Sequence, residues 1–240
     1  MDATQSAVLI AHGFTGSPYE LQGLADYLRE KNMAVSLPTL PGHGTSPDDL
    51  RRHGPDSWMA ALRASYAALE NEYQQISIVG LSVGGSLALK LASEVPSASL
   101  VVIDAPVRLN FHTAIKVALP IWRALTGPDL IKPKTGMFAN EQIPGYEQRC
   151  YDQIPIAIFQ DMMRFLEREM NPPTFAHITA PTLLVQGSED NIVSPSSAAT
   201  VFKYLGSAKK ERVDWQDRFH LIVQGERKQE LYQLVADWIA

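Results

Sequence analysis

Short apolar runs alternate with longer amphipathic stretches along most of the chain. The apolar runs are Ala7–Ala11, Ala34–Leu37, Ile76–Gly80, Leu100–Asp104, Thr182–Gly187 and Glu211–Trp215. The amphipathic stretches predict helices near Tyr19–Lys31, Ser57–Tyr73, Gly84–Ser93, Pro195–Tyr204 and Glu226–Ile239. Such alternation is typical of a parallel sheet whose faces are covered by helices. The pattern therefore predicts an α/β fold with a mainly parallel central sheet flanked by helices.

One segment, from about residue 107 to 173, breaks this alternation. It contains no convincing strand, and its apolar residues recur at helical spacing between prolines and glycines. These residues are Ile115, Leu119, Trp122, Phe159, Met162, Met163 and Leu166. The segment is longer than an ordinary crossover needs. We expect residues 107–173 to form a small helical cap inserted after the fourth predicted strand, with residues 1–106 and 174–240 as the core. The alternative is that these helices belong to the core itself.

Composition narrows the classes of function. A chain of 240 residues suits one core domain with a small insertion. The net charge of −5 and the lack of a dense Lys/Arg run argue against a nucleic-acid partner. Cys150 is the only cysteine, which excludes an intramolecular disulfide and argues against a cysteine zinc site. No basic leader and no run of eighteen apolar residues occur, so we expect a cytoplasmic protein without a transmembrane segment.

The predicted strand Ile76–Gly80 runs into the sequence Gly80-Leu81-Ser82-Val83-Gly84, and a helix of small residues follows. Gly-x-Ser-x-Gly between a strand and a helix is a nucleophile elbow, in which the serine is exposed on a sharp, strained turn. The helix also points its N-terminus at the reaction centre, where its dipole favours developing negative charge. The motif predicts Ser82 as a nucleophile, and the alternative is an ordinary turn residue.

A second strand runs into a glycine-rich turn at His12-Gly13-Phe14-Thr15-Gly16. With a nucleophile elbow, one backbone N–H from such a loop and one from the residue after the nucleophile form an oxyanion hole. We therefore expect the N–H groups of Phe14 and Val83 to bind the oxyanion. The alternative for this segment is a plain strand–turn–helix connection. His12 precedes the turn, and we expect it to orient the loop by hydrogen bonding.

The general base is expected among the histidines that follow Ser82, which are His112, His177 and His220. The chain order with this elbow is serine, then acid, then histidine. His112 lies in the predicted cap, and His177 precedes a strand that has not yet begun. His220 follows the last predicted strand, where a base can reach the serine, and is therefore the predicted general base.

The acid is expected in the loop after Thr182–Gly187, where Glu189 and Asp190 are adjacent. Asp190 is favoured because Asn191-Ile192-Val193 follows it and anchors the loop in the core. Asp104 is a further rival, since some hydrolases place the acid after the earlier strand that Asp104 ends. Its alternative role is that of an ordinary aspartate capping the turn after that strand. The predicted triad of Ser82, Asp190 and His220 works through an acyl-enzyme and requires no metal or organic cofactor.

Four motifs together resemble the bacterial carboxylesterases and monoacylglycerol lipases of the α/β-hydrolase superfamily. They are His12–Pro18, Leu40–Gly44, Gly80–Gly85 and the Gly187…Asp190-x-Ile-Val stretch. The resemblance extends over nearly the whole chain and is weakest in the cap. It implies the α/β-hydrolase fold and hydrolysis of carboxylic esters, with short- or medium-chain acyl groups and monoacylglycerols as candidates. The implied partner is a small-molecule ester substrate.

The resemblance has departures that concern the substrate pocket. Many relatives have Met after the elbow serine, where this chain has Val83. In the lipases an acidic cap residue after a tyrosine helps to bind glycerol, and Tyr151-Asp152 lies in a comparable place. The resemblance thus implies a substrate-binding role for Asp152, whose alternative is a solvated surface residue. His43, in Pro-Gly-His-Gly, is expected to shape its loop.

Other functions share the predicted fold and triad. A thioesterase is one alternative, and the sequence does not separate it from an esterase. A carbon–carbon bond hydrolase is another, for which Arg108, Lys116 and Arg123 would supply charge to an otherwise apolar cap. A non-catalytic receptor of the same fold is the third. Haloalkane dehalogenase chemistry is disfavoured, because its nucleophile is Asp where this chain has Ser82.

Overall fold

The computed structural model of the chain describes residues 6–110, 112–126, 131–133, 151, 153–216 and 220–240. Its centre is a six-stranded sheet in the order β2-β1-β3-β4-β7-β8, in which every neighbouring pair is parallel. The strands are β1 (Ser6–Ala11), β2 (Ala34–Ser36), β3 (Gln75–Leu81), β4 (Leu100–Ile103), β7 (Thr182–Gly187) and β8 (Lys210–Trp215). The six strands predicted from the apolar runs, and their parallel arrangement, are confirmed.

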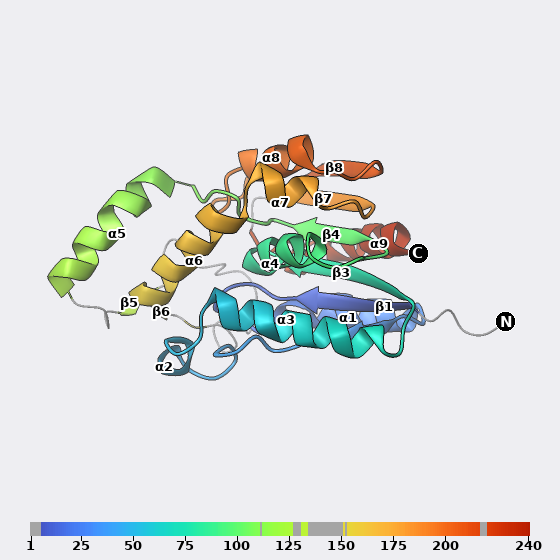
Figure 1. Ribbon diagram of the computed structural model, residues 1–240, viewed down its shortest axis with the longest axis horizontal. Coiled ribbons are helices and arrows are strands. Elements are labelled where there is room, and N and C mark those ends of the chain that lie inside the picture. The colour runs from blue at the N-terminus through green and yellow to red at the C-terminus, as the bar shows by residue number, and fades with distance from the viewer. Residues whose placement is uncertain (1–5, 111, 127–130, 134–150, 152, 217–219) are drawn as a thin grey trace.

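Helices cover both faces of this sheet (Figure 1). One face carries α1 (Tyr19–Glu30) and α9 (Lys228–Ile239), and the other carries α3 (Pro55–Glu70), α4 (Val83–Ala92) and α8 (Ser196–Tyr204). In β1, Val8 and Ile10 pack with the first layer, whereas Leu9 and Ala11 pack with the second. Because both faces are buried, the strands read as continuous apolar runs. The five predicted helices are confirmed, with ends that differ by a few residues.

The chain between β4 and β7 leaves the sheet, and part of it lies beyond the carboxyl ends of the strands (Figure 1). The elements of this segment are α5 (His112–Thr126), β5 (Ile131–Pro133), β6 (Gln153–Pro155), α6 (Ile156–Glu169) and α7 (Pro172–Ala176). β5 and β6 pair antiparallel. The expectation that this segment holds no strand is therefore wrong. Each of the two strands has three residues and includes a proline, which is too short for an alternating pattern to appear.

The segment between β4 and β7, called the insertion below, is mainly helical in its described residues and packs partly on the core. In α6, the predicted apolar residues Phe159, Met162, Met163 and Leu166 are all buried in the cluster that contains α3 and α4. In α5, by contrast, Val117 and Ile121 are exposed. In this segment α6 packs on the core, whereas α5 extends away from it. A cap bounded at residues 107 and 173 stays a prediction.

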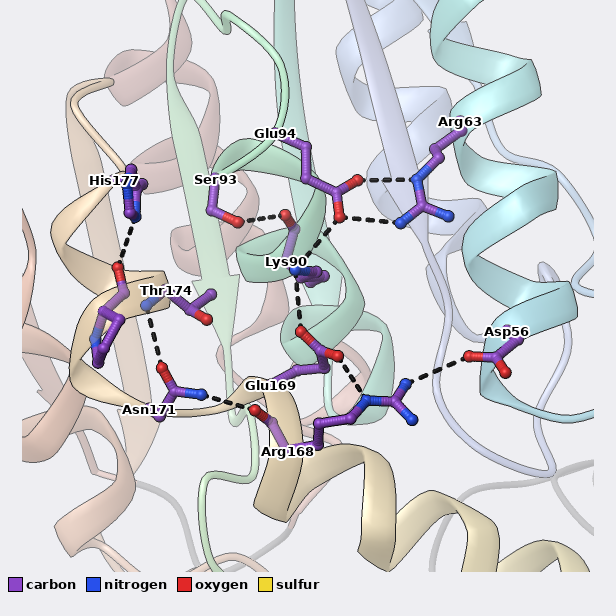
Figure 2. Close-up of polar contacts among 11 residues, drawn as sticks. Asp56, Arg63, Lys90, Ser93, Glu94, Arg168, Glu169, Asn171, Thr174 and His177 are labelled. Atoms are coloured by element: carbon purple, nitrogen blue, oxygen red, sulfur yellow. Dashed lines mark hydrogen bonds and ion pairs between the residues drawn. The ribbon is translucent and has the colours of Figure 1, made fainter.

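Ion pairs join the end of α6 to α3 and α4 (Figure 2). The Nζ of Lys90 lies 2.9 Å from Oε2 of Glu169 in α6 and 3.3 Å from Oε1 of Glu94. Arg63 of α3 donates from Nε and Nη2 to Glu94 at 2.7 and 2.8 Å. Partly exposed pairs each contribute only about 0–1 kcal/mol. They link the end of α6 to α4, the helix that begins next to Ser82.

The apolar pattern does not predict three short elements, which are α2 (Pro47–Leu50), α7 and the 3₁₀ helix η1 (Ile222–Gln224). α2 and α7 each begin with a side-chain cap, from Ser46 and Asn171, followed by proline. Within the described ranges, no helix has the length and apolar character needed to cross a membrane.

Candidate active site

Three polar side chains meet at the carboxyl end of the sheet. Ser82 follows β3, Asp190 follows β7 and His220 follows β8, so the parallel strands bring them to one edge. The Nε2 of His220 lies 2.8 Å from Oγ of Ser82, and its Nδ1 lies 2.7 Å from Oδ2 of Asp190. All three are largely buried, and the side chain of His220 is 11% exposed. This is the geometry in which an imidazole activates a hydroxyl and a carboxylate orients the imidazole.

Ser82 lies on a sharp turn between β3 and α4. Its φ is 54°, in the left-handed region that few residues other than glycine adopt. Its N–H donates to the carbonyl of Ile103 at 2.8 Å, and its own carbonyl accepts from the N–H of Gly85 at 2.8 Å. The turn is therefore fixed on both sides. Val83 begins α4, and an N–H in this position has no acceptor within the helix.

Gly84 permits the close approach of α4 to the end of β1. A Cβ at this position would lie 2.3 Å from the carbonyl oxygen of Ala11 and 2.4 Å from that of His12. We expect Gly84→Ala to displace the helix, lowering the free energy of unfolding by about 3 kcal/mol and kcat by about 10²-fold. Urea denaturation and steady-state kinetics measure both effects.

Gly54→Ala is the matched control, because a Cβ at Gly54 would meet no atom within 4 Å. This control is expected to fold and turn over like the wild type. A Gly84→Ala variant as stable and as active as the control would contradict the steric explanation.

The two adjacent acids after β7 have different environments. Glu189 is exposed, whereas Asp190 is 4% exposed. The Oδ1 of Asp190 accepts from the N–H groups of Ile192 and Val193 at 2.8 and 2.9 Å, which leaves Oδ2 directed at His220. The carboxylate is therefore held by the residues that follow it in the loop, and Asp190 is the one that contacts the histidine.

Asp104, the rival acid, lies beside the triad and is fully buried. Its Oδ1 accepts from the N–H of Gly187 at 2.6 Å and from Nε2 of Gln186 at 3.0 Å. The same Nε2 lies 3.3 Å from Oδ2 of Asp190. Asp104 therefore braces the acid loop through the neighbouring strand. Gln186 was not among the predicted site residues, and the available signal was its polar side chain within an apolar strand.

The electrostatics of the site favour a charged acid beside a basic histidine. Burial acts to lower the pKa of His220, but the charge of Asp190 and the hydrogen bond to it hold that pKa above its ordinary value of 6.5. Asp104 and Glu20 add smaller contributions in the same direction. Burial acts to raise the pKa of Asp190, but the charge and hydrogen bond of His220 keep it below the usual 3.8. Asp190 is therefore ionised at neutral pH.

Two buried histidines shape the loop after β1. The Nε2 of His12 accepts from the N–H of Leu40 at 3.1 Å, and its Nδ1 lies 3.0 Å from the carbonyl oxygen of Gly13. The Nδ1 of His43 lies 3.3 Å from the carbonyl oxygen of Pro41. Burial lowers the pKa of His12 to about 4 and that of His43 to about 3. Both are neutral at pH 7, and the predicted hydrogen bonding of His12 and loop-shaping by His43 are confirmed.

Glu20 is a buried carboxylate below this loop. Its Oε2 accepts from the N–H of Gly13 at 3.2 Å, and a Cβ on Gly16 would lie 2.2 Å from the carboxyl group. Glu20 is 3% exposed although it belongs to the first turn of a helix. Acids are common in the first turns of helices, so the position of Glu20 does not by itself mark it as a site residue. The loop that carries Phe14 is thus supported by the carboxyl group of Glu20.

The remaining candidates lie apart from the triad or outside the described residues. His177 is exposed, and its Nδ1 lies 2.8 Å from the carbonyl oxygen of Pro173. Arg108 is also exposed. Asp152 and Cys150 lie outside the described residues, as do the side chains of His112, Lys116 and Arg123.

Tyr151 joins the insertion to two loops at the site. Its N–H donates to the carbonyl of Thr15 at 3.0 Å, and its hydroxyl donates to the carbonyl of Gly42 at 2.8 Å. The same hydroxyl accepts from the N–H of Thr45 at 2.7 Å. The ring of Phe14 packs against Trp58 and Phe159, with centroids 5.7 and 6.4 Å apart. The loop after β1 is therefore flanked by the insertion and by apolar rings.

Comparison with known proteins gives a consistent group of relatives. A family model described as serine aminopeptidase, S33 (Hydrolase_4), matches residues 2–228. A thermostable monoacylglycerol lipase of Bacillus sp. (strain H-257) is 30% identical over 218 residues, covering 89% of this chain and 82% of the relative. A carboxylesterase of Bacillus subtilis (strain 168) is 26% identical over 234 residues, covering 97% and 92%.

The fold agrees with that of solved structures. One of them is described with LipS and LipT, two metagenome-derived lipolytic enzymes. It superimposes with a TM-score of 0.85 at 24% identity, over 99% of this chain and 94% of the other. This likeness shows that the sheet and its helical layers form an α/β-hydrolase fold.

Proposed function

The chain belongs to the α/β-hydrolase family whose model is described as serine aminopeptidase, S33, and on that premise we propose that it is a serine hydrolase of carboxylic esters. The observation that carries the proposal is the hydrogen-bonded series Ser82–His220–Asp190 at a nucleophile elbow. Two relatives that cover most of this chain are named as a monoacylglycerol lipase and a carboxylesterase, which supports an ester substrate. The substrate is a small-molecule ester, and the cytoplasmic location stays a prediction.

The proposed reaction begins with Ser82. His220 Nε2 removes the hydroxyl proton while Oγ attacks the ester carbonyl, and a tetrahedral intermediate forms. Asp190 holds the imidazole with its proton on Nδ1 and stabilises the imidazolium. His220 then gives the proton to the leaving alcohol, which leaves an acyl group on Ser82. Water activated by His220 releases the acid and restores the serine.

The negative charge of the intermediate needs donors at fixed positions. The N–H of Val83 lies at the N-terminus of α4, where the helix dipole favours an anion. Phe14 supplies the second N–H. Its loop is held by Glu20, which accepts from the N–H of Gly13, and by Tyr151, which donates to the carbonyl of Thr15. Losing one such donor typically costs about 10²–10³ in kcat. We assign the oxyanion hole to Phe14 and Val83 on this basis.

A substrate series tests the ester assignment. The kcat/KM values are measured for p-nitrophenyl esters and monoacylglycerols of rising chain length, together with an acyl thioester and an aminoacyl p-nitroanilide. We expect esters of short or medium chain to give the highest value, and the length at the maximum to report the pocket depth. Faster cleavage of the anilide would favour a peptidase, and faster cleavage of the thioester would favour a thioesterase; either result would contradict the proposal.

The pH dependence of ester hydrolysis follows from the environment of His220. The base must be neutral to accept the proton, and its pKa is held above 6.5 by Asp190. We therefore expect kcat/KM to rise with pH through a single ionisation whose midpoint lies above 6.5. Initial rates between pH 5 and about 9 measure the midpoint. A flat profile would argue against His220 as the base, and a midpoint below 6.5 would contradict the effect assigned to Asp190.

A further inference from the structure

A second buried carboxylate lies beside the proposed acid. One oxygen of Asp104, one oxygen of Asp190 and one ring nitrogen of His220 all lie within 4.8 Å of one another. Asp104 is 0% exposed and follows β4, the strand between β3 and β7 in the sheet. Two strands therefore direct a carboxylate at the same imidazole.

One amide joins the two carboxylates. The Nε2 of Gln186 lies 3.0 Å from Oδ1 of Asp104 and 3.3 Å from Oδ2 of Asp190. The Oε1 of Gln186 is buried and has no hydrogen-bond partner within the described part of the chain. The amide is thus held by its nitrogen side, because the opposite orientation would turn Oε1 toward two carboxylate oxygens. The bridge fixes Asp190 relative to Asp104.

Burying two carboxylates side by side is costly, because like charges repel and neither is hydrated. The fold compensates Asp104 with the N–H of Gly187 at 2.6 Å and with Gln186. Its φ of 48° lies in the left-handed region, which aspartate and asparagine tolerate better than other side chains. An uncharged asparagine would fit this backbone and accept the same hydrogen bonds. The nearby imidazole gives a physical reason for a charge at this position.

Building on the proposed function, we infer that Asp104 is a positioning residue that holds Asp190 through Gln186 and stabilises the imidazolium of His220 as a second anion. When Asp190 is removed, Asp104 is close enough to orient the imidazole through a small rotation or one bridging water. The site then has two carboxylates for one base, with Asp190 in direct contact and Asp104 behind it.

The pH profile of Asp104→Asn tests the charge separately from the hydrogen bonds. Among the described residues, the charged groups that face His220 are Asp190 from the β7 loop, Asp104 from the end of β4, and Glu20 from α1. Removing one anion makes the imidazolium less stable. We therefore expect the midpoint of the kcat/KM profile to fall by about one pH unit. A merely structural residue would lower the rate without moving the midpoint.

Glu189→Gln is the matched control, because it removes one negative charge from the same loop at an exposed position. Its midpoint is expected to stay at the wild-type value. Thermal melting checks that both variants fold, and Asp104→Ser repeats the profile with a smaller side chain. An Asp104→Asn midpoint equal to that of Glu189→Gln overturns the inference.

A double-mutant cycle tests whether Asp104 can orient His220 when Asp190 is removed, which we call the reserve role of Asp104. Asp104→Asn is expected to lower the plateau kcat/KM at least about tenfold more in an Asp190→Ala background than in the wild type, since Asp104 is then the remaining carboxylate. Equal effects in the two backgrounds overturn the reserve role.

Ser82→Ala separates this inference from the proposed function. If Ser82→Ala is inactive while Asp104→Asn behaves like the control, only the inference about Asp104 fails.

Discussion

Replacing Ser82 by alanine is expected to lower kcat/KM for ester hydrolysis by about 10³- to 10⁶-fold. The variant keeps the imidazole, its acid and the backbone donors, but it has no oxygen to form an acyl intermediate. The hydroxyl lies 2.8 Å from Nε2 of His220 and makes no contribution to the hydrophobic core. The fold and its melting temperature are therefore expected to persist. Initial rates on the best ester of the chain-length series measure the loss.

Ser196→Ala is the matched control for this loss, because Ser196 is an exposed serine at the start of α8. It removes the same hydroxyl from a place remote from the elbow, and its activity is expected to equal that of the wild type. Ester turnover by Ser82→Ala within tenfold of the control would mean that another group is the nucleophile.

Replacing His220 by alanine is expected to lower kcat/KM by a similar factor, about 10³- to 10⁶-fold. Residues of a triad act as a unit, so removing the base costs nearly as much as removing the nucleophile. The pH dependence of the residual activity identifies the role of His220. It is expected to rise with hydroxide concentration, without the ionisation that His220 gives to the wild-type profile.

His177→Ala is the matched histidine control, because that side chain is exposed and hydrogen-bonds locally, to the carbonyl of Pro173. Its rate and its pH midpoint are expected to stay at the wild-type values. A His220→Ala variant that keeps the wild-type midpoint would show that a different group is the titrating base.

Much of the fold was predictable because the central strands are buried on both faces. In β1, Val8 and Leu9 face opposite helical layers and both need to be apolar, so the run is visible in the sequence. The elbow was predictable for a similar local reason, since Gly80 and Gly84 have no room for a side chain. β5 and β6 were not predictable, because three residues that include a proline carry no period.

Long-range contacts set the limits of the site prediction. The sequence placed Glu189 and Asp190 next to each other, but only the fold of the loop exposes one and directs the other at His220. Glu20 looks like an ordinary helix-start acid, and its contact with Gly13 depends on how α1 returns beneath the loop. Such contacts join residues that no local pattern relates. The predicted role of Asp152 in substrate binding lies outside the described residues and stays a prediction.

Asp104 illustrates the same limit in a different way. From the sequence it was an alternative to Asp190, because the two follow different strands of the sheet. The order β4-β7 makes those strands neighbours, so the two carboxylates lie together and share Gln186. Two positions that appeared as competing choices are thus parts of one arrangement.

The acyl-enzyme itself is the most direct test of a serine hydrolase at this elbow. The wild type is mixed with a slowly deacylated p-nitrophenyl ester, quenched in acid within the burst phase, and digested for mass spectrometry. An acyl group on Ser82, in amounts matching the p-nitrophenol burst and absent from Ser82→Ala, is the predicted result. A burst whose acyl group is found on a different residue, or hydrolysis without any covalent acyl-enzyme, would contradict the proposed mechanism.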